Sequence, residues 1–150
     1  MTGRHEARLM AVQFLFQVDF NGGELPEALA EFWSGRKAGP KIRAFMEELV
    51  HGVLENKTAL DEQVVRYAAN WDISRMGAVD RNVMRVALFE MLHREDIPPV
   101  VSINEAVDIA KELSSEESGK FVNGILDRAR KDMTRPARAA TPAKAASDNG

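Results

Sequence analysis

The clearest helical pattern in this chain is Asp80-Arg81-Asn82-Val83-Met84-Arg85-Val86-Ala87-Leu88-Phe89-Glu90-Met91-Leu92. Apolar residues recur in it at intervals of three and four, which places them on one face of a helix. The residues expected in the core are Val83, Met84, Ala87, Leu88 and Met91. The stretch therefore predicts an amphipathic helix packed against the rest of the protein.

The same spacing recurs along most of the chain, so we expect an all-α protein of about seven helices. The other expected helices are residues 4–20, 26–33, a longer helix with apolar residues from Ile42 to Val53, 58–69, 102–113 and 118–133. Two of them are expected to open on capping boxes, Thr58 with Asp61 and Ser102 with Glu105. Asn21-Gly22-Gly23 should end the first helix, and Pro98-Pro99 should form an extended link.

The helices are expected to form two packed helical-bundle subdomains, residues 1–70 and 71–133, followed by a tail. The junction between them contains Asp72, Ser74 and Gly77. Trp71 is expected to be a core residue at this junction, with a base-stacking surface as the alternative. Residues 134–150 carry almost no large apolar side chain, so we expect a disordered tail whose cations attract phosphate weakly.

Composition favours a cytoplasmic binding protein over an enzyme. The chain has 45% hydrophobic and 29% charged residues, as folded proteins do, and no apolar run reaches the roughly 20 residues that span a membrane. It has no cysteine, which excludes disulfides and thiolate metal sites. The three histidines are far apart and no phosphate-binding glycine motif occurs, so we expect no catalysis, cofactor or metal.

The net charge of −3 means that nucleic-acid binding would need a local basic patch or a basic partner. One candidate patch is Arg4, His5 and Arg8 at the start of the first helix, with Phe16 two turns further on. Cations beside an aromatic ring suit single-stranded RNA, through phosphate contacts and base stacking. The alternative is that both arginines are ordinary surface charges and that Phe16 lies in the core.

A second candidate patch is Lys120-Phe121 with Asn123, at the start of the last helix. Asn123 would hydrogen-bond a base edge or neighbouring backbone. The alternative is that Phe121 belongs to the core and that Asn123-Gly124 allows close helix packing.

Three ordered blocks carry a resemblance to a known family. They are residues 80–90 (DRNVMRVALFE), 96–111 (DIPPVVSINEAVDIAK) and 118–127 (SGKFVNGILD). They resemble the NusB-family motifs D-R-x-[IVL]-[LM]-R-x-A-x-[YF]-E, D-I-P…V-x-I-N-E-A-V…A-K and S-x-x-F-V-N-G-[VI]-L-D. Residues 7–16 resemble the family's first helix more loosely, and the resemblance covers about residues 4–133.

The resemblance implies a transcription antitermination factor. With NusE, a small-subunit ribosomal protein, it would bind the boxA element of nascent, chiefly ribosomal, transcripts and help RNA polymerase read through terminators. The RNA-contacting residues implied by position are Arg4, His5, Arg8, Gln13, Phe16, Lys120 and Phe121. The implied NusE-facing residues are Asp80, Arg81 and Glu117.

This chain departs from many relatives in having only Arg4-His5-Glu6-Ala7-Arg8 where they carry a longer arginine run. Fewer cations release fewer counterions, so we expect weak RNA binding by the chain alone and a dependence on basic NusE. Two other interpretations remain open. One is a protein-docking module, with a homodimer hiding its basic face, and the other is an accessory domain of an RNA-modifying enzyme, which needs a further cofactor-binding domain.

Overall fold

The computed structural model describes residues 3–69 and 72–133, which form seven α-helices, one short 3₁₀-helix and no strand. The elements are α1 (Gly3–Asn21), α2 (Leu25–Ser34), α3 (Pro40–Glu55), α4 (Lys57–Tyr67), η1 (Ile73–Arg75), α5 (Ala78–His93), α6 (Pro99–Leu113) and α7 (Glu116–Lys131). The predicted all-helical class is confirmed. Trp71 and the tail lie outside the described residues. None of the described helices is long and apolar enough to cross a membrane.

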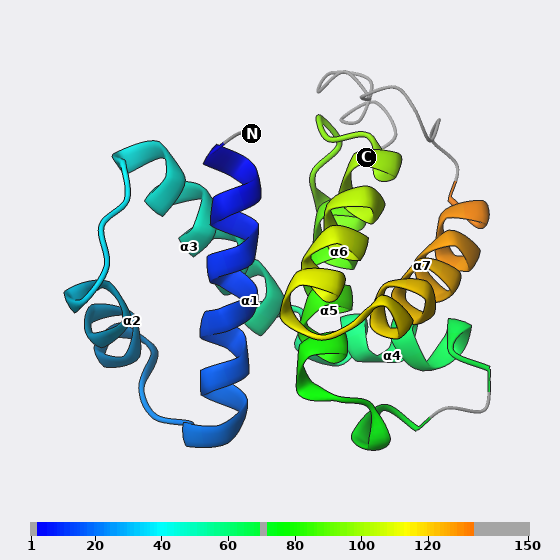
Figure 1. Cartoon of the computed structure of the whole chain (residues 1–150), viewed down its shortest axis with the longest axis horizontal. Coiled ribbons are helices and arrows are strands. Elements are labelled where there is room, and N and C mark those ends of the chain that lie inside the picture. The colour runs from blue at the N-terminus through cyan, green and yellow to red at the C-terminus, as the bar shows by residue number, and fades with distance from the viewer. Residues whose placement is uncertain (1–2, 70–71, 134–150) are drawn as a thin grey trace.

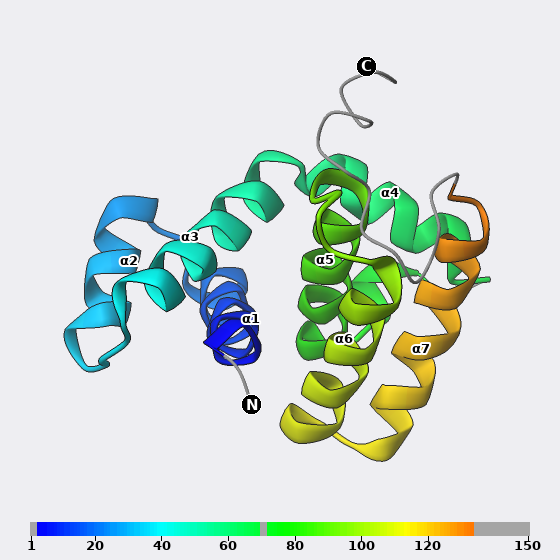
Figure 2. The ribbon, with the colours of Figure 1, turned by 90° about the horizontal axis from the view of Figure 1, so that it is seen from above.

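Helix α1 lies at the centre of the arrangement (Figures 1 and 2), between α2 and α3 on one side and α5 and α6 on the other. Helices α5, α6 and α7 pack against one another, and α4 packs mainly against α5 and α7. The expected division after residue 70 stays a prediction about folding units, because α4 precedes that residue and yet packs with the C-terminal helices.

A single hydrophobic core runs through both halves of the chain. All five apolar residues expected on the inner face of α5 are buried there. The face of α1 is buried as expected from Ala7 to Leu15, while Val18 is only partly buried. Asn21 ends α1 as predicted, and Gly22 follows in the left-handed conformation (φ 65°) that glycine tolerates.

Neither of the two predicted capping boxes opens its helix. Helix α6 begins at Pro99, not at Ser102, because proline suits the first helical position, where an N–H has no partner inside the helix. The predicted capping box at Ser102 is therefore wrong, and so is the extended link through Pro99. Helix α4 begins at Lys57, so the capping box at Thr58 is also wrong.

Asp61, the carboxylate expected in the capping box at Thr58, has a partner on another helix. Asp61 accepts hydrogen bonds from Arg85 Nε (2.7 Å) and Nη2 (3.1 Å), which ties α4 to α5. On the same side of α5, Asn82 Nδ2 donates to Asp19 of α1 (2.9 Å). These polar contacts fix how α1 and α4 sit on α5, and thereby orient the residues of α1 that concern function.

Candidate RNA-binding surface

Arg4 lies exposed in the first turn of α1, and its guanidinium sits 4.6 Å from the centre of the Phe45 ring. It lines a surface hollow of about 470 Å³ between α1 and α3, together with Lys41 and Arg94. Arg94 is bound by Glu48 (2.8 Å) and by Asp96, and these carboxylates raise its pKa. Arg4 and Lys41 are therefore the cations of this hollow that carry no ion pair with the described residues.

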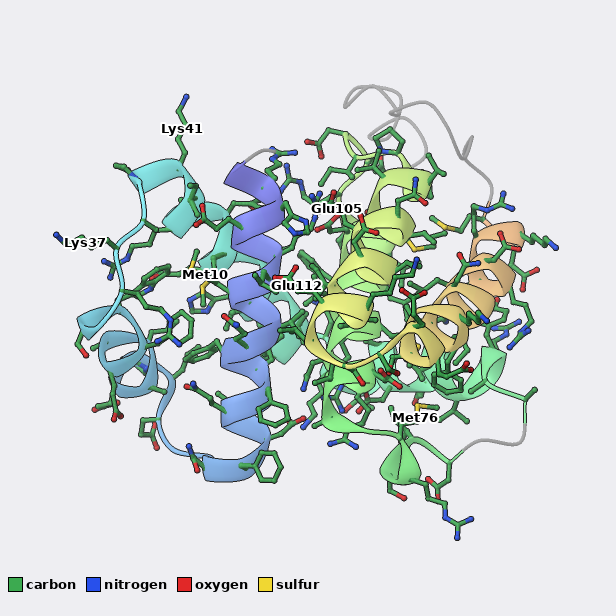
Figure 3. The ribbon with its side chains drawn as sticks, viewed as in Figure 1. Met10, Lys37, Lys41, Met76, Glu105 and Glu112 are labelled. Carbon is green, nitrogen blue, oxygen red and sulfur yellow. The ribbon has the colours of Figure 1, made fainter. Side chains whose placement is uncertain are left out.

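His5 is held by two carboxylates of α6. Its Nδ1 lies 2.6 Å from Glu105 Oε1, and its Nε2 lies 3.7 Å from Glu112 Oε1. Figure 3 shows Glu105 and Glu112 on α6, on the side that faces α1. His5 is partly exposed, so it fastens the start of α1 to α6 while part of its ring still faces solvent.

Arg8 does not lie on the surface. Its side chain is only 5% exposed, and its Nε and Nη2 donate to the two carboxylate oxygens of Glu90 at 2.6 and 3.1 Å. Ser102 donates to the same carboxylate (2.7 Å), and Glu105 lies 3.6 Å from Arg8 Nη1. The expected contact of Arg8 with RNA does not fit this geometry, because the guanidinium is enclosed between α1, α5 and α6.

Gln13 and Phe16 lie one turn apart on α1, and both are partly buried. They line a hollow of about 350 Å³ with Gln17, Arg36 and Leu113 among its other residues. The Phe16 ring lies 5.0 Å from that of Phe20, which is 71% exposed. The hollow thus combines side-chain amides, a guanidinium and an aromatic ring, which are groups that bind and stack on unpaired bases.

The second predicted patch is divided between surface and core. Lys120 is exposed on α7, whereas Phe121 is partly buried against the hydrophobic core. The helix begins after Ser115, whose hydroxyl accepts a hydrogen bond from Ser118 N (3.1 Å). Lys120 is therefore available to a ligand, and Phe121 has mainly a packing role among the described residues.

The three expected partner-facing residues lie at the starts of α5 and α7. Asp80 is half-buried, and this burial raises its pKa, while a hydrogen bond from Ser118 opposes the shift. Its Oδ1 is buried without a hydrogen-bond partner among the described residues. Glu117 is exposed and precedes Ser118, the residue of α7 that hydrogen-bonds Asp80.

Arg81 is already engaged within the protein. Its Nη1 donates to the Met76 carbonyl (2.5 Å), and its Nη2 lies 3.5 Å from Asp19. The guanidinium of Arg81 is therefore largely satisfied within the chain.

Sequence reasoning missed two groups of residues near these sites. The first is the set of buried Glu90 and Ser102 and partly exposed Glu105, which holds Arg8 and His5 in place. Glu90 is the last residue of the motif at residues 80–90, but the local sequence does not indicate which cation would pair with it. The second is the run of cations from Arg36 to Arg43, which was visible in the sequence but had no known position relative to α1.

No group of three or more histidine, aspartate or glutamate side chains is placed to hold a metal ion in the part of the chain that the structure describes. Around α1 the described helices present two hollows, one lined by the cations Arg4 and Lys41 and the other by side-chain amides, a guanidinium and the partly buried ring of Phe16. These features define a small helical protein with a candidate nucleic-acid-binding surface.

Comparison with known proteins agrees with this class. The model of the NusB family matches residues 5–131. The chain therefore belongs to the NusB family, as the motifs at residues 80–127 implied. It is 42% identical over 135 residues to the transcription antitermination protein NusB of Sorangium cellulosum, which covers 90% of this chain and 96% of the relative. It is 41% identical over 130 residues to that of Bacillus subtilis, covering 87% and 96%.

Solved structures give the same result. The NusB of T. maritima is 37% identical and covers 95% of this chain and 96% of its own, with a TM-score of 0.79. A crystal structure of the antitermination factors NusB and NusE in complex with double-stranded RNA contains a chain that is 25% identical. It covers 89% of this chain and 99% of its own, with a TM-score of 0.81.

Proposed function

We propose that this protein is a transcription antitermination factor that binds boxA RNA of nascent, chiefly ribosomal, transcripts together with NusE. In this role it promotes read-through by RNA polymerase, acts in the cytoplasm and catalyses no reaction. The observation that carries the proposal is the likeness of nearly the whole chain to the NusB chain of a complex with NusE and RNA. Family membership over residues 5–131 supports it independently.

The RNA contacts are proposed for Arg4, Gln13, Phe16 and Lys120. Arg4 and Lys120 are exposed cations for phosphate, whereas Gln13 and Phe16 line a hollow with room for an unstacked base. His5 and Phe121 contribute through the parts of their rings that remain exposed. Arg8 acts differently from the expectation, as a buried positioning residue that holds the start of α1 against α5 and α6.

NusE is proposed to bind Asp80, Arg81 and Glu117. A basic ribosomal protein is attracted to carboxylates, and Asp80 of α5 is hydrogen-bonded to Ser118 of α7, the residue that follows the exposed Glu117.

The test is RNA binding measured by gel shift with boxA RNA and a scrambled RNA of equal length, with and without NusE. We expect weak binding by the chain alone, and tight binding with preference for boxA when NusE is added. Equal affinity of the heterodimer for both RNAs would contradict the proposal. Strong self-association with no RNA binding under either condition would instead support the docking-module interpretation.

A further inference from the structure

The segment from Arg36 to Arg43 is the most basic part of the described surface near α1. It contains Arg36, Lys37, Lys41 and Arg43 within eight residues and no acidic residue, in a chain whose net charge is −3. We call residues 36–43 the basic segment. It joins α2 to α3 and includes the first turn of α3.

The basic segment lies on the side of α1 that carries α2 and α3, opposite α6 (Figure 1). Arg36, at one end, lines the hollow that contains Gln13 and Phe16. Lys41, near the other end, lines the hollow that contains Arg4. One short stretch of chain thus supplies a cation to each of the two hollows where the candidate RNA-binding residues of α1 lie.

Three of these cations are available to a ligand. Lys37 and Lys41 project away from the helices (Figure 3), are exposed and form no ion pair with the described residues. Arg36 is held over the Phe32 ring (3.8 Å) by a hydrogen bond from Nη1 to the Phe32 carbonyl (3.0 Å). This contact fixes the guanidinium and leaves its other N–H groups to donate elsewhere.

Arg43 differs because it is already partnered, by Glu47 (3.3 Å) and by the Trp33 ring (4.9 Å). The start of α3 adds to the field of the other cations. Its N-cap residue is Gly39, so no side chain accepts a hydrogen bond from the first N–H groups of the helix, and the first turn holds no acidic residue. The unpaired N–H groups there attract anions.

We propose that Arg36, Lys37 and Lys41 bind phosphates of the RNA, extending the surface formed by Arg4, Gln13 and Phe16. This inference rests on the proposed RNA-binding function and adds a second element to it. Contacts to phosphate carry no sequence information, so the basic segment raises affinity for any RNA that crosses it. It also compensates for the short arginine run at the start of α1.

The test compares the full-length protein with a triple variant, R36Q/K37Q/K41Q, in complex with NusE. Affinity for boxA and scrambled RNA is measured by fluorescence anisotropy at several salt concentrations. Loss of three phosphate contacts should make the slope of log K against log salt shallower by about 2. Affinity should fall by a similar factor for both RNAs, so that the preference for boxA is unchanged.

A matched control removes three exposed cations far from α1, in the variant K57Q/R66Q/R75Q. The control has the same net charge, so it separates a local contact from a general effect of charge. The double variant K37Q/K41Q keeps the contact of Arg36 with Phe32 and guards against misfolding, and it should lose about two-thirds of the change in slope. Thermal melting verifies that each variant is folded.

Two outcomes would overturn the inference while leaving the proposed function intact. One is a triple variant with the wild-type slope and affinity, which would mean that the basic segment serves another partner. The other is an equal loss in the control triple variant. Failure of the proposed function gives a different result, because the wild-type complex itself would then not prefer boxA.

Discussion

Replacing Glu90 by glutamine should destabilise the protein strongly. The Glu90 side chain is fully buried and accepts hydrogen bonds from Arg8 and Ser102. Without its charge, the buried guanidinium of Arg8 keeps Glu105, at 3.6 Å, as its one carboxylate partner among the described residues, beside the Phe45 ring at 5.5 Å. Breaking a buried ion pair costs about 3–5 kcal/mol, and the remaining carboxylate favours the lower end, about 3 kcal/mol. For a chain of this size that corresponds to a fall in Tm of about 10 °C.

The assay is urea denaturation followed by far-ultraviolet circular dichroism. Lys131→Gln is the control, because it removes an exposed ion pair with Asp127 (3.5 Å) and should change the free energy of unfolding by less than about 0.5 kcal/mol. Replacing both members of the buried pair, in R8M/E90L, should restore most of the stability, because no charge is then left unpaired. A Glu90→Gln variant as stable as the control would refute the reasoning.

The same double variant tests the role given to Arg8. If Arg8 only positions α1, R8M/E90L should bind boxA RNA with NusE within about threefold of wild type, a difference of less than 1 kcal/mol. A loss comparable to that of Arg4→Gln would instead place Arg8 in contact with RNA.

The remaining predictions concern four single positions. Phe16→Ala should weaken RNA binding by about 1–3 kcal/mol through lost stacking, and Arg4→Gln should lower affinity and the salt slope, with helicity unchanged in both by circular dichroism. Because burial raises the pKa of Asp80 in the folded state, folding loses stability as pH rises through that pKa. Asp80→Asn should therefore be more stable than wild type at neutral pH, but not at a pH below the unfolded-state pKa of the carboxyl group. Its affinity for NusE, measured by calorimetry, should fall. A variant as stable as wild type at neutral pH and at the low pH would contradict the stability prediction. Gly52→Ala should destabilise by about 1–3 kcal/mol in urea titrations, because an added Cβ would lie 2.2 Å from the Phe89 ring, and a neutral result would show that the ring can move.

The helices were predictable because their signal is local. Apolar spacing on α1 and α5 identified the buried faces, and Asn21-Gly22-Gly23 identified the end of α1. The starts of α4 and α6 were less predictable, since Thr58 and Ser102 both look like capping residues in sequence. Ser102 instead lies inside α6 and donates to Glu90, a residue on another helix. A short polar side chain can cap its own helix or hydrogen-bond a residue on another helix, and the spacing of neighbouring residues does not distinguish these two roles.

The candidate site was predicted in part. Arg4, Gln13, Phe16 and Lys120 are exposed or partly exposed, as an RNA contact requires, although their contact with RNA stays a proposal. The cations of the basic segment were as visible in the sequence as Arg4. Their relevance depends on the packing of α2 and α3 beside α1, which brings Arg36 and Lys41 into the same hollows as residues of α1 and which no local pattern predicts.

The amino-acid sequence by itself determined the helical class, the faces that would be buried and the family, because periodicity and motifs are properties of neighbouring residues. Only the tertiary structure decided which charges are free. Arg4 and Arg8 are one turn apart on the same helix, yet one lies at the surface and the other is enclosed by Glu90. The physical reason is that packing between helices selects the partner of a buried charge, and here the partners Arg8 and Glu90 are 82 residues apart in the chain.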